Sequence, residues 1–163
     1  MFGLLNVHKP PGPTSHDVVA LARKLMPRRV KVGHAGTLDP FAEGVLVLCV
    51  GPATRLAEYI QRQPKRYLAD VHLGATSDTN DPEGEITATP DAAAPAPETV
   101  TAALSRFVGD IRQVPPAFSA VHVGGQRAYQ AARAGKRPDL PARTVTVHSI
   151  DVANYDWPLL RID

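Results

Sequence analysis

The residues best suited to chemistry in this sequence lie in one glycine-bounded loop, Gly33-His34-Ala35-Gly36-Thr37-Leu38-Asp39-Pro40. Its two glycines allow a ligand to approach the backbone closely. Pro40 restricts the preceding Asp39 to an extended backbone, which limits the directions in which the carboxylate can point. A carboxylate held in this way suits covalent or acid–base work. An Asp-Pro turn with no catalytic role would use the same residues, so the loop alone leaves both interpretations open.

Other familiar catalytic patterns are missing from the sequence. It has no GxxxxGKS or GxxxxGKT phosphate loop, no GxGxxG, no CxxC, no HExxH and no GxSxG. The six histidines are scattered without the spacing of a metal site. We therefore expect neither a metal ion nor a nucleotide cofactor. Cys49 lies inside the apolar run 45–50 and is predicted to be a small buried residue.

Charge is distributed unevenly along the chain. Residues 1–36 hold six lysines and arginines against one acid, residues 122–144 hold five against one, and residues 76–99 hold six acids and no base. Two basic segments on a chain of net charge +2 suggest a face that binds a polyanion. Ordinary solvated surface is also charged, and composition alone does not separate the two interpretations.

The elements that must position the loop follow from periodicity and turn residues. Strands are predicted over 3–7, 45–50, 66–73, 119–123, 143–150 and the last stretch up to Asp163. Helices are predicted from Ser15 to Met26, Thr54 to Ile60, Thr99 to Phe107 and Ala128 to Ala134, with Ser15, Thr54 and Thr99 as N-caps. Strands and helices mix without regular βαβ alternation. The pattern predicts an α+β fold with a mixed, mainly antiparallel central sheet flanked by helices.

Length and hydropathy place the chain in a broad class. Its 163 residues suffice for one domain with a sizeable core, and no apolar run approaches the length of a membrane span. The N-terminus lacks the layout of a signal peptide, so we expect a cytoplasmic chain, and a monomer. The sequence stops at Leu159-Leu160-Arg161-Ile162-Asp163, which has the character of the middle of a strand, so we expect a fragment.

The loop followed by Ala42-Glu43-Gly44-Val45-Leu46 resembles the catalytic motif of pseudouridine synthases of the TruB family. Further stretches that resemble family motifs occur in the same order: Asn6 with Lys9-Pro10-Pro11-Gly12-Pro13-Thr14-Ser15, Gly51-Pro52-Ala53-Thr54-Arg55, Lys65-Arg66-Tyr67, Leu73 to Thr79, and Pro115 to Ala120 with Gly125 to Tyr129 and Ala132-Arg133. The resemblance runs from about residue 3 to about residue 150. Several motifs in order over that length make it specific.

The resemblance implies the pseudouridine synthase fold and an activity. The family isomerises a uridine in the T-loop of tRNA, position 55, to pseudouridine, so the expected partner is the T-arm stem-loop of tRNA. A stacked base is out of reach, so it must be flipped out before the N-glycosidic bond breaks and a carbon–carbon bond forms. The resemblance assigns the essential carboxylate to Asp39. Covalent attack and an elimination route both remain open.

The resemblance also suggests roles for residues around the carboxylate. Tyr67 would stack on the flipped base and could act as a general base, although a strand tyrosine can also be structural. His34 would occupy the space left by the flipped nucleotide, with Gly36 and Thr37 beside it on the RNA. Lys9 could contact a phosphate or could be a solvated lysine.

The second basic segment resembles the part of the family that grips RNA. It contains Arg127, Tyr129, Arg133 and Arg143, together with Lys136 and Arg137. Basic residues with an aromatic, bounded by glycine, suit a clamp that orders on RNA, whereas a charged helix face would have similar composition. His122 stands where the pattern more often has lysine.

The resemblance further implies that residues 1–163 are an incomplete catalytic domain. In the family, a strand with a Gly-Thr-Tyr-Ile-Arg-like motif follows, its arginine pairs with the aspartate, and an RNA-binding domain comes later. Without that arginine, the 163-residue chain is expected to turn over weakly at best. Other hypotheses are a non-catalytic RNA-binding or RNA-folding module, a sheet-forming assembly fragment, and a related enzyme that takes its target from a guide RNA.

Overall fold

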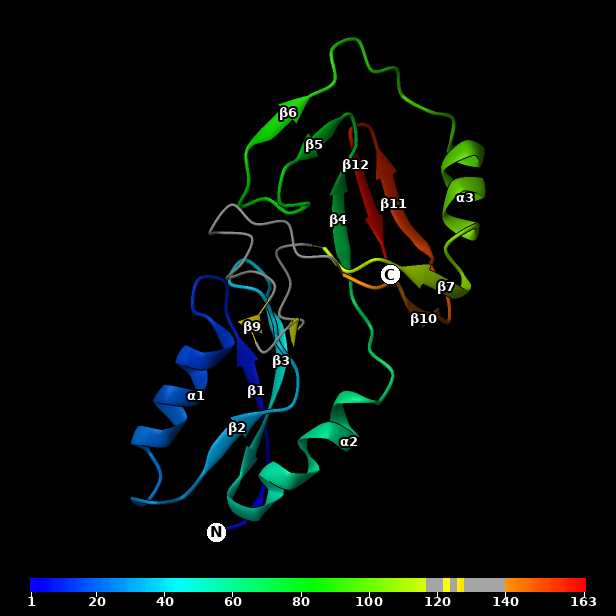
Figure 1. Cartoon of the computed structure of the whole chain (residues 1–163). Coiled ribbons are helices and arrows are strands. Elements are labelled where there is room, and N and C mark those ends of the chain that lie inside the picture. Colours follow the sequence, from blue (N-terminus) through cyan, green and yellow to red (C-terminus); the bar gives the residue numbers. More distant parts are fainter. Residues whose placement is uncertain (117–121, 124–125, 128–139) are drawn as a thin grey trace. The chain divides into compact units, whose positions relative to one another are not determined.

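The computed structural model describes residues 1–116, 122–123, 126–127 and 140–163 (Figure 1). They form two compact units, Met1–Lys65 and Arg66–Asp163. Among the described residues no helix is long and apolar enough to cross a membrane.

The first unit is built on three antiparallel strands. Its elements are β1 (Gly3–Lys9), α1 (Ser15–Lys24), β2 (Val32–His34), β3 (Gly44–Val50), the 3-10 helix η1 (Gly51–Leu56) and α2 (Ala57–Gln61). The strand order is β1-β3-β2, so β3 lies in the centre. The register of β1 on β3 runs from Gly3 opposite Val50 to Lys9 opposite Gly44.

Helices cover both faces of this sheet. On one face, Val19 of α1 packs with Val32, Leu46 and Leu48. On the other, Cys49 packs with Ala35 and Ala53, and Ile60 of α2 lies against them. Cys49 is fully buried, which confirms its prediction as a small core residue. The strand β3 alternates between these two clusters, as a central strand must.

The helix caps differ from the predicted ones. Thr14, not Ser15, is the N-cap of α1, and Thr14 and Asp17 form a reciprocal capping box. These hydrogen bonds from Thr14 lower the pKa of Asp17. Thr54 lies inside η1, where its hydroxyl donates to the Gly51 carbonyl, and the N-cap of α3 is Ala96 instead of Thr99.

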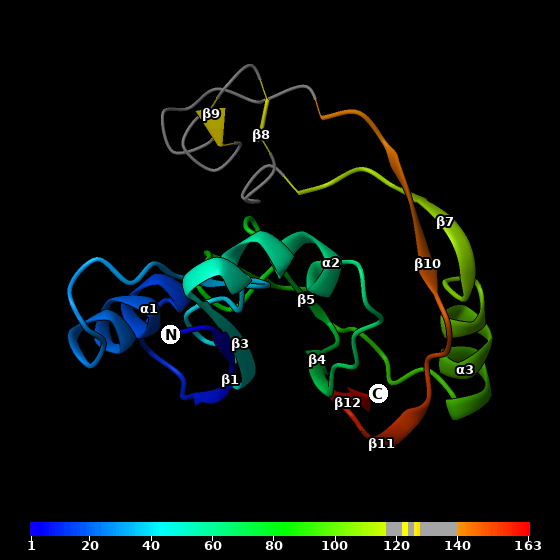
Figure 2. The ribbon, with the colours of Figure 1, turned by 90° about the horizontal axis from the view of Figure 1, so that it is seen from below.

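The second unit consists of short antiparallel pairs and one helix. Its elements are β4 (Ala69–His72), β5 (Ala75–Ser77), β6 (Ile86–Ala88), α3 (Pro97–Ser105), β7 (Gly109–Gln113), β8 (His122–Val123), β9 (Gln126–Arg127), β10 (Arg143–Val147), β11 (Val152–Asp156) and β12 (Leu159–Ile162). The sheets are β11-β12-β4, β10-β7, β5-β6 and β8-β9. Figure 2 shows β4, β12 and β11 side by side.

Every described strand pair is antiparallel, which confirms the predicted α+β fold with mainly antiparallel pairing. The predicted strand 66–73 is shorter than expected, because β4 pairs with β12 only from Ala69 to His72. Arg161 and Asp70 form a charged pair across this ladder, and the arginine lowers the pKa of that carboxyl. The predicted helix 128–134 and most of the strand 119–123 lie outside the described residues.

We predict that the stability of the first unit depends on the buried face of β3. Leu48 is fully buried, so Leu48→Ala should lower the free energy of unfolding by roughly 2–5 kcal/mol through lost burial and a cavity. Val45, on the same strand, is 68% exposed, so Val45→Ala should cost about 1 kcal/mol or less. Urea denaturation of both variants measures the difference. Equal losses would contradict the assignment of the core.

Candidate active site

The backbone on the N-terminal side of Asp39 is held by α1. The Ser15 hydroxyl accepts a hydrogen bond from the Leu38 N–H at 2.9 Å and donates one to the Leu38 carbonyl at 2.8 Å. The Leu38 side chain packs against the cluster formed by Val19 and its neighbours. Both the main chain and the side chain of the residue before Asp39 are therefore fixed.

The backbone on the C-terminal side is held by the loop after β1. The Pro40 carbonyl accepts hydrogen bonds from the Gly12 N–H at 2.8 Å and from Lys9 Nζ at 3.1 Å. Gly12 has a φ of +106°, a conformation that favours glycine and that brings its N–H to this carbonyl. The Ala42 N–H donates to the Asp39 carbonyl at 3.1 Å, which closes a tight turn.

Lys9 is neither solvated nor placed to contact a phosphate, which corrects both roles expected from the sequence. Its side chain is fully buried, and Nζ donates to the carbonyls of Pro10 at 2.9 Å, Pro40 at 3.1 Å and Ala42 at 2.8 Å. An ammonium has three protons to donate, and all three have acceptors here. No acidic side chain pairs with it among the described residues. Lys9 thus ties the end of β1 to the turn that follows Asp39.

The Asp39 side chain is left available by this anchoring. It is exposed, and it makes no ion pair or side-chain hydrogen bond with any residue that the structure describes. The hydrogen bonds on both sides fix the backbone of Asp39, and its oxygens are open to solvent, so the carboxylate is free to meet a ligand. The arrangement suits a nucleophile or a base.

Three further predicted residues lie on the same loop. His34, at the end of β2, is half-buried, and its Nδ1 is hydrogen-bonded to the Gly36 carbonyl. The ring of His16 meets the His34 ring edge to face, with centroids 6.0 Å apart and an interplanar angle of 87°. Gly36 has a φ of +141°, so a side chain there would strain the backbone, and Thr37 is exposed.

The remaining predicted residues belong to the second unit or lie outside the described residues. The sequence predicts that Tyr67 lies on a strand, but it precedes β4 and lies outside it. Its side chain is 59% exposed. Arg143 is the first residue of β10 and is exposed, and Arg127 is in β9. Tyr129 and Arg133 lie outside the described residues, as do Lys136 and Arg137.

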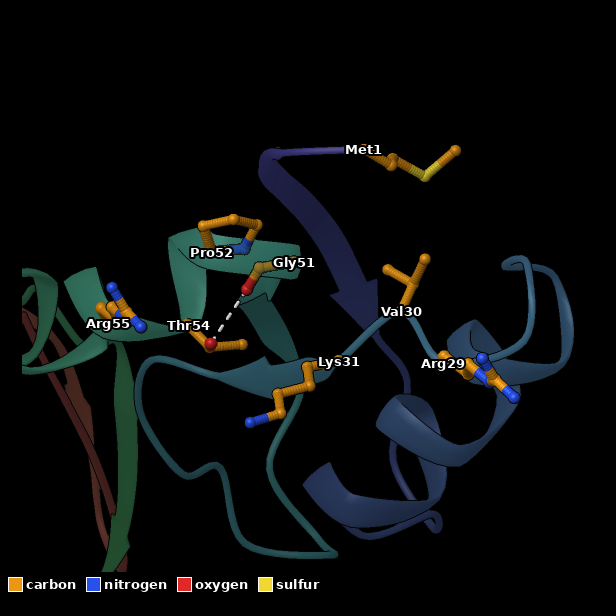
Figure 3. A pocket seen from close by; sticks show the side chains of 8 residues that line it. All are labelled: Met1, Arg29, Val30, Lys31, Gly51, Pro52, Thr54 and Arg55. Carbon is orange, nitrogen blue, oxygen red and sulfur yellow. Dashed lines mark hydrogen bonds between the residues drawn. The ribbon is translucent and has the colours of Figure 1, made fainter.

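A basic hollow of about 460 Å³ lies at the other end of the three-stranded sheet (Figure 3). It is lined by Met1, Arg29, Val30, Lys31, Gly51, Pro52, Thr54 and Arg55. Two of these residues are joined directly, because the Gly51 N–H, next to the last residue of β3, donates to the Lys31 carbonyl at 2.7 Å. Arg29, Lys31 and Arg55 are all exposed, and Figure 3 shows their charged ends spread around the hollow rather than converging on one point.

The described residues include no group of three or more histidine, cysteine, aspartate or glutamate side chains placed to hold a metal ion. The anchoring roles of Ser15 and Lys9 were not predicted from the sequence, although it carries a signal for each. Lys9 follows Val7 by two residues and so lies on the same face of β1, the face on which Val7 packs against the core. Thr14 followed three residues later by Asp17 resembles a capping box, which indicates Thr14 as the N-cap. Ser15 is then not needed to cap the helix.

Comparison with known proteins gives a family match and similar relatives. The model of the TruB family pseudouridylate synthase N-terminal domain matches residues 23–163. The tRNA pseudouridine synthase B of Bacillus licheniformis is 48% identical over 153 residues, which are 93% of this chain and 49% of the relative. That of Symbiobacterium thermophilum is 48% identical over 153 residues, 94% of this chain and 51% of the relative. The chain thus spans about half the length of these curated relatives.

Solved structures agree with the fold. A chain in a structure of an H/ACA RNP bound to a substrate RNA containing 2′-deoxyuridine superposes with a TM-score of 0.65 and 27% identity, covering 99% of this chain and 36% of that one. A chain in a Cbf5–Nop10–Gar1 complex gives a TM-score of 0.65 and 30% identity, covering 99% and 38%.

We predict that Lys9→Met loosens the turn after Asp39. The methionine keeps most of the apolar stem but takes the donor from the carbonyls of Pro10 and Ala42, whereas the Pro40 carbonyl keeps the Gly12 N–H; the loss should cost roughly 1–3 kcal/mol. The matched control is Lys24→Met, because Lys24 is exposed in the last turn of α1 and should cost about 0.5 kcal/mol. Chemical denaturation of both variants measures these losses, and a Lys9→Met variant as stable as the control would contradict the anchoring role.

Proposed function

The chain belongs to the TruB family of pseudouridylate synthases, and we propose that it isomerises the T-loop uridine at position 55 of tRNA to pseudouridine, with Asp39 as the essential carboxylate. The exposed Asp39 carboxylate, on a backbone held on both sides, is the observation that carries this proposal. The curated relatives that match the chain are named tRNA pseudouridine synthase B, which supports tRNA as the substrate.

In this reaction the protein has to position the uridine and to supply a carboxylate. The N-glycosidic bond of the uridine breaks, the base turns, and a bond forms between the ribose and carbon C5 of the same base, which then releases its proton. N1 of the base takes up one proton while C5 releases one, so the product is an isomer of the uridine and the atoms balance without a cofactor. Asp39 would meet the ribose or the base of the flipped nucleotide, and Tyr67 would stack on that base.

Other residues of the first unit would contact the RNA. His34, Gly36 and Thr37 lie on the loop that carries Asp39 and would line the place of the flipped nucleotide. The basic hollow at Arg29, Lys31 and Arg55 would hold backbone phosphates. An RNA-binding module without catalysis would use the same surfaces. The carboxylate separates the two functions, since phosphate binding does not need it.

We predict that Asp39→Asn abolishes isomerisation and spares RNA binding. The amide keeps the shape of the side chain but is neither a nucleophile nor a base at neutral pH. Tritium release from a tRNA transcript labelled at uridine C5 measures turnover, and titration of a T-arm stem-loop measures binding. Release by the wild type but not by the variant is the expected result. Equal release by both would contradict the role of Asp39, and release by neither, with binding intact, would mean that these 163 residues bind the RNA but do not complete the active site by themselves.

We also predict that the basic hollow contributes to binding rather than to chemistry. Replacing both Lys31 and Arg55 by glutamine should weaken T-arm binding. The slope of the logarithm of the binding constant against the logarithm of the salt concentration should become less steep, by about one for each phosphate that the variant no longer neutralises. Lys24→Gln removes an exposed charge outside the hollow and serves as the control. An unchanged salt dependence in the double variant would contradict a phosphate-binding role for the hollow.

A further inference from the structure

Ser15 is a buried polar side chain whose hydrogen bonds all go to one distant residue. It is 3% exposed, and its hydroxyl both accepts from and donates to the main chain of Leu38, which is 23 residues away in the sequence. A serine at the start of a helix ordinarily caps that helix. Here the cap is Thr14, through its hydrogen bonds with Asp17. The Ser15 hydroxyl therefore serves the loop and not the helix.

Leu38 needs such a partner because it lies outside the sheet. The segment from Thr37 to Asp39 has no strand pairing, so the sheet does not satisfy the N–H and carbonyl of Leu38. Half-buried backbone groups without partners are costly. One hydroxyl satisfies both, and in doing so it fixes the orientation of the peptide groups on either side of Leu38. The second of these peptide groups leads directly into Asp39.

We propose that Ser15 is the positioning residue of Asp39: its hydroxyl orients the Leu38 main chain and thereby the direction of the Asp39 carboxylate. The role deepens the function proposed above and rests on it. Ser15 acts through Leu38, so it contributes to the rate of the chemical step and not to RNA affinity. A small misplacement of a reacting group is enough to slow a reaction strongly, even when the substituted residue is remote from the chemistry.

The test compares Ser15→Ala with Thr14→Ala. Both substitutions remove a hydroxyl at the start of α1, but only Ser15 contacts Leu38, and alanine is well tolerated at the first position of a helix. In the whole chain, single-turnover tritium release should fall by about 10- to 100-fold for Ser15→Ala, with T-arm affinity within about twofold of wild type. Thr14→Ala should keep a turnover close to that of wild type at a temperature where both variants are folded.

Amide hydrogen exchange at Leu38 provides a readout that is independent of activity. The Leu38 N–H should exchange at least about tenfold faster in Ser15→Ala and at the wild-type rate in Thr14→Ala. Unchanged exchange in Ser15→Ala, or turnover equal to that of Thr14→Ala, would overturn the proposal. Absence of tritium release by the wild-type chain would count against turnover by these 163 residues, and the exchange rate at Leu38 would still decide whether Ser15 orders the loop.

Discussion

The buried ammonium of Lys9 is the interaction on which the arrangement around Asp39 depends. Removing a charge from water costs several kcal/mol, so the interior tolerates it only when every proton has an acceptor. Three backbone carbonyls, from Pro10, Pro40 and Ala42, meet that condition. They come from the loop after β1 and from the turn after Asp39, so satisfying the charge requires both segments to be in place together. The register of Lys9 opposite Gly44 brings the ammonium to this position.

The same constraint explains how the loop can be rigid while its carboxylate is free. Hydrogen bonds to Leu38 and Pro40 use main-chain atoms only, on both sides of Asp39. The position of the Asp39 backbone is thus set by neighbours that do not compete for its carboxylate oxygens. A carboxylate held through an ion pair would be equally well oriented, but its charge would already be shared with the partner. Preorganisation through the backbone leaves the full charge for the substrate.

Sequence patterns predict the parts of this structure that follow from local chemistry. The alternation in β1, the apolar run of β3, the burial of Cys49 and the glycine-bounded loop of Asp39 all have a period or a backbone requirement that can be recognised in the chain. The role of Lys9 is harder to predict, because lysine is almost never fully buried and its acceptors lie up to 33 residues away. The alternation of residues 66–73 includes Tyr67, so the sequence predicts a strand at that position. The length of a strand, however, is set by its partner, and β12 pairs with β4 only from Ala69 onward.

The first unit places the exposed carboxylate of Asp39 and the basic hollow near opposite ends of one strand, β3. Asp39 lies near the Gly44 end of β3, where Lys9 binds the turn, and the basic hollow adjoins the Val50 end at Gly51. Seven residues of strand span about 20 Å, which exceeds the screening length of about 8 Å at physiological salt. The exposed cations of the hollow therefore act weakly on the Asp39 carboxylate. Under the proposed function, a polyanion that reaches both ends would be bound at the hollow and presented to the carboxylate at the other end, so that binding strength and the reactivity of the carboxylate can vary independently.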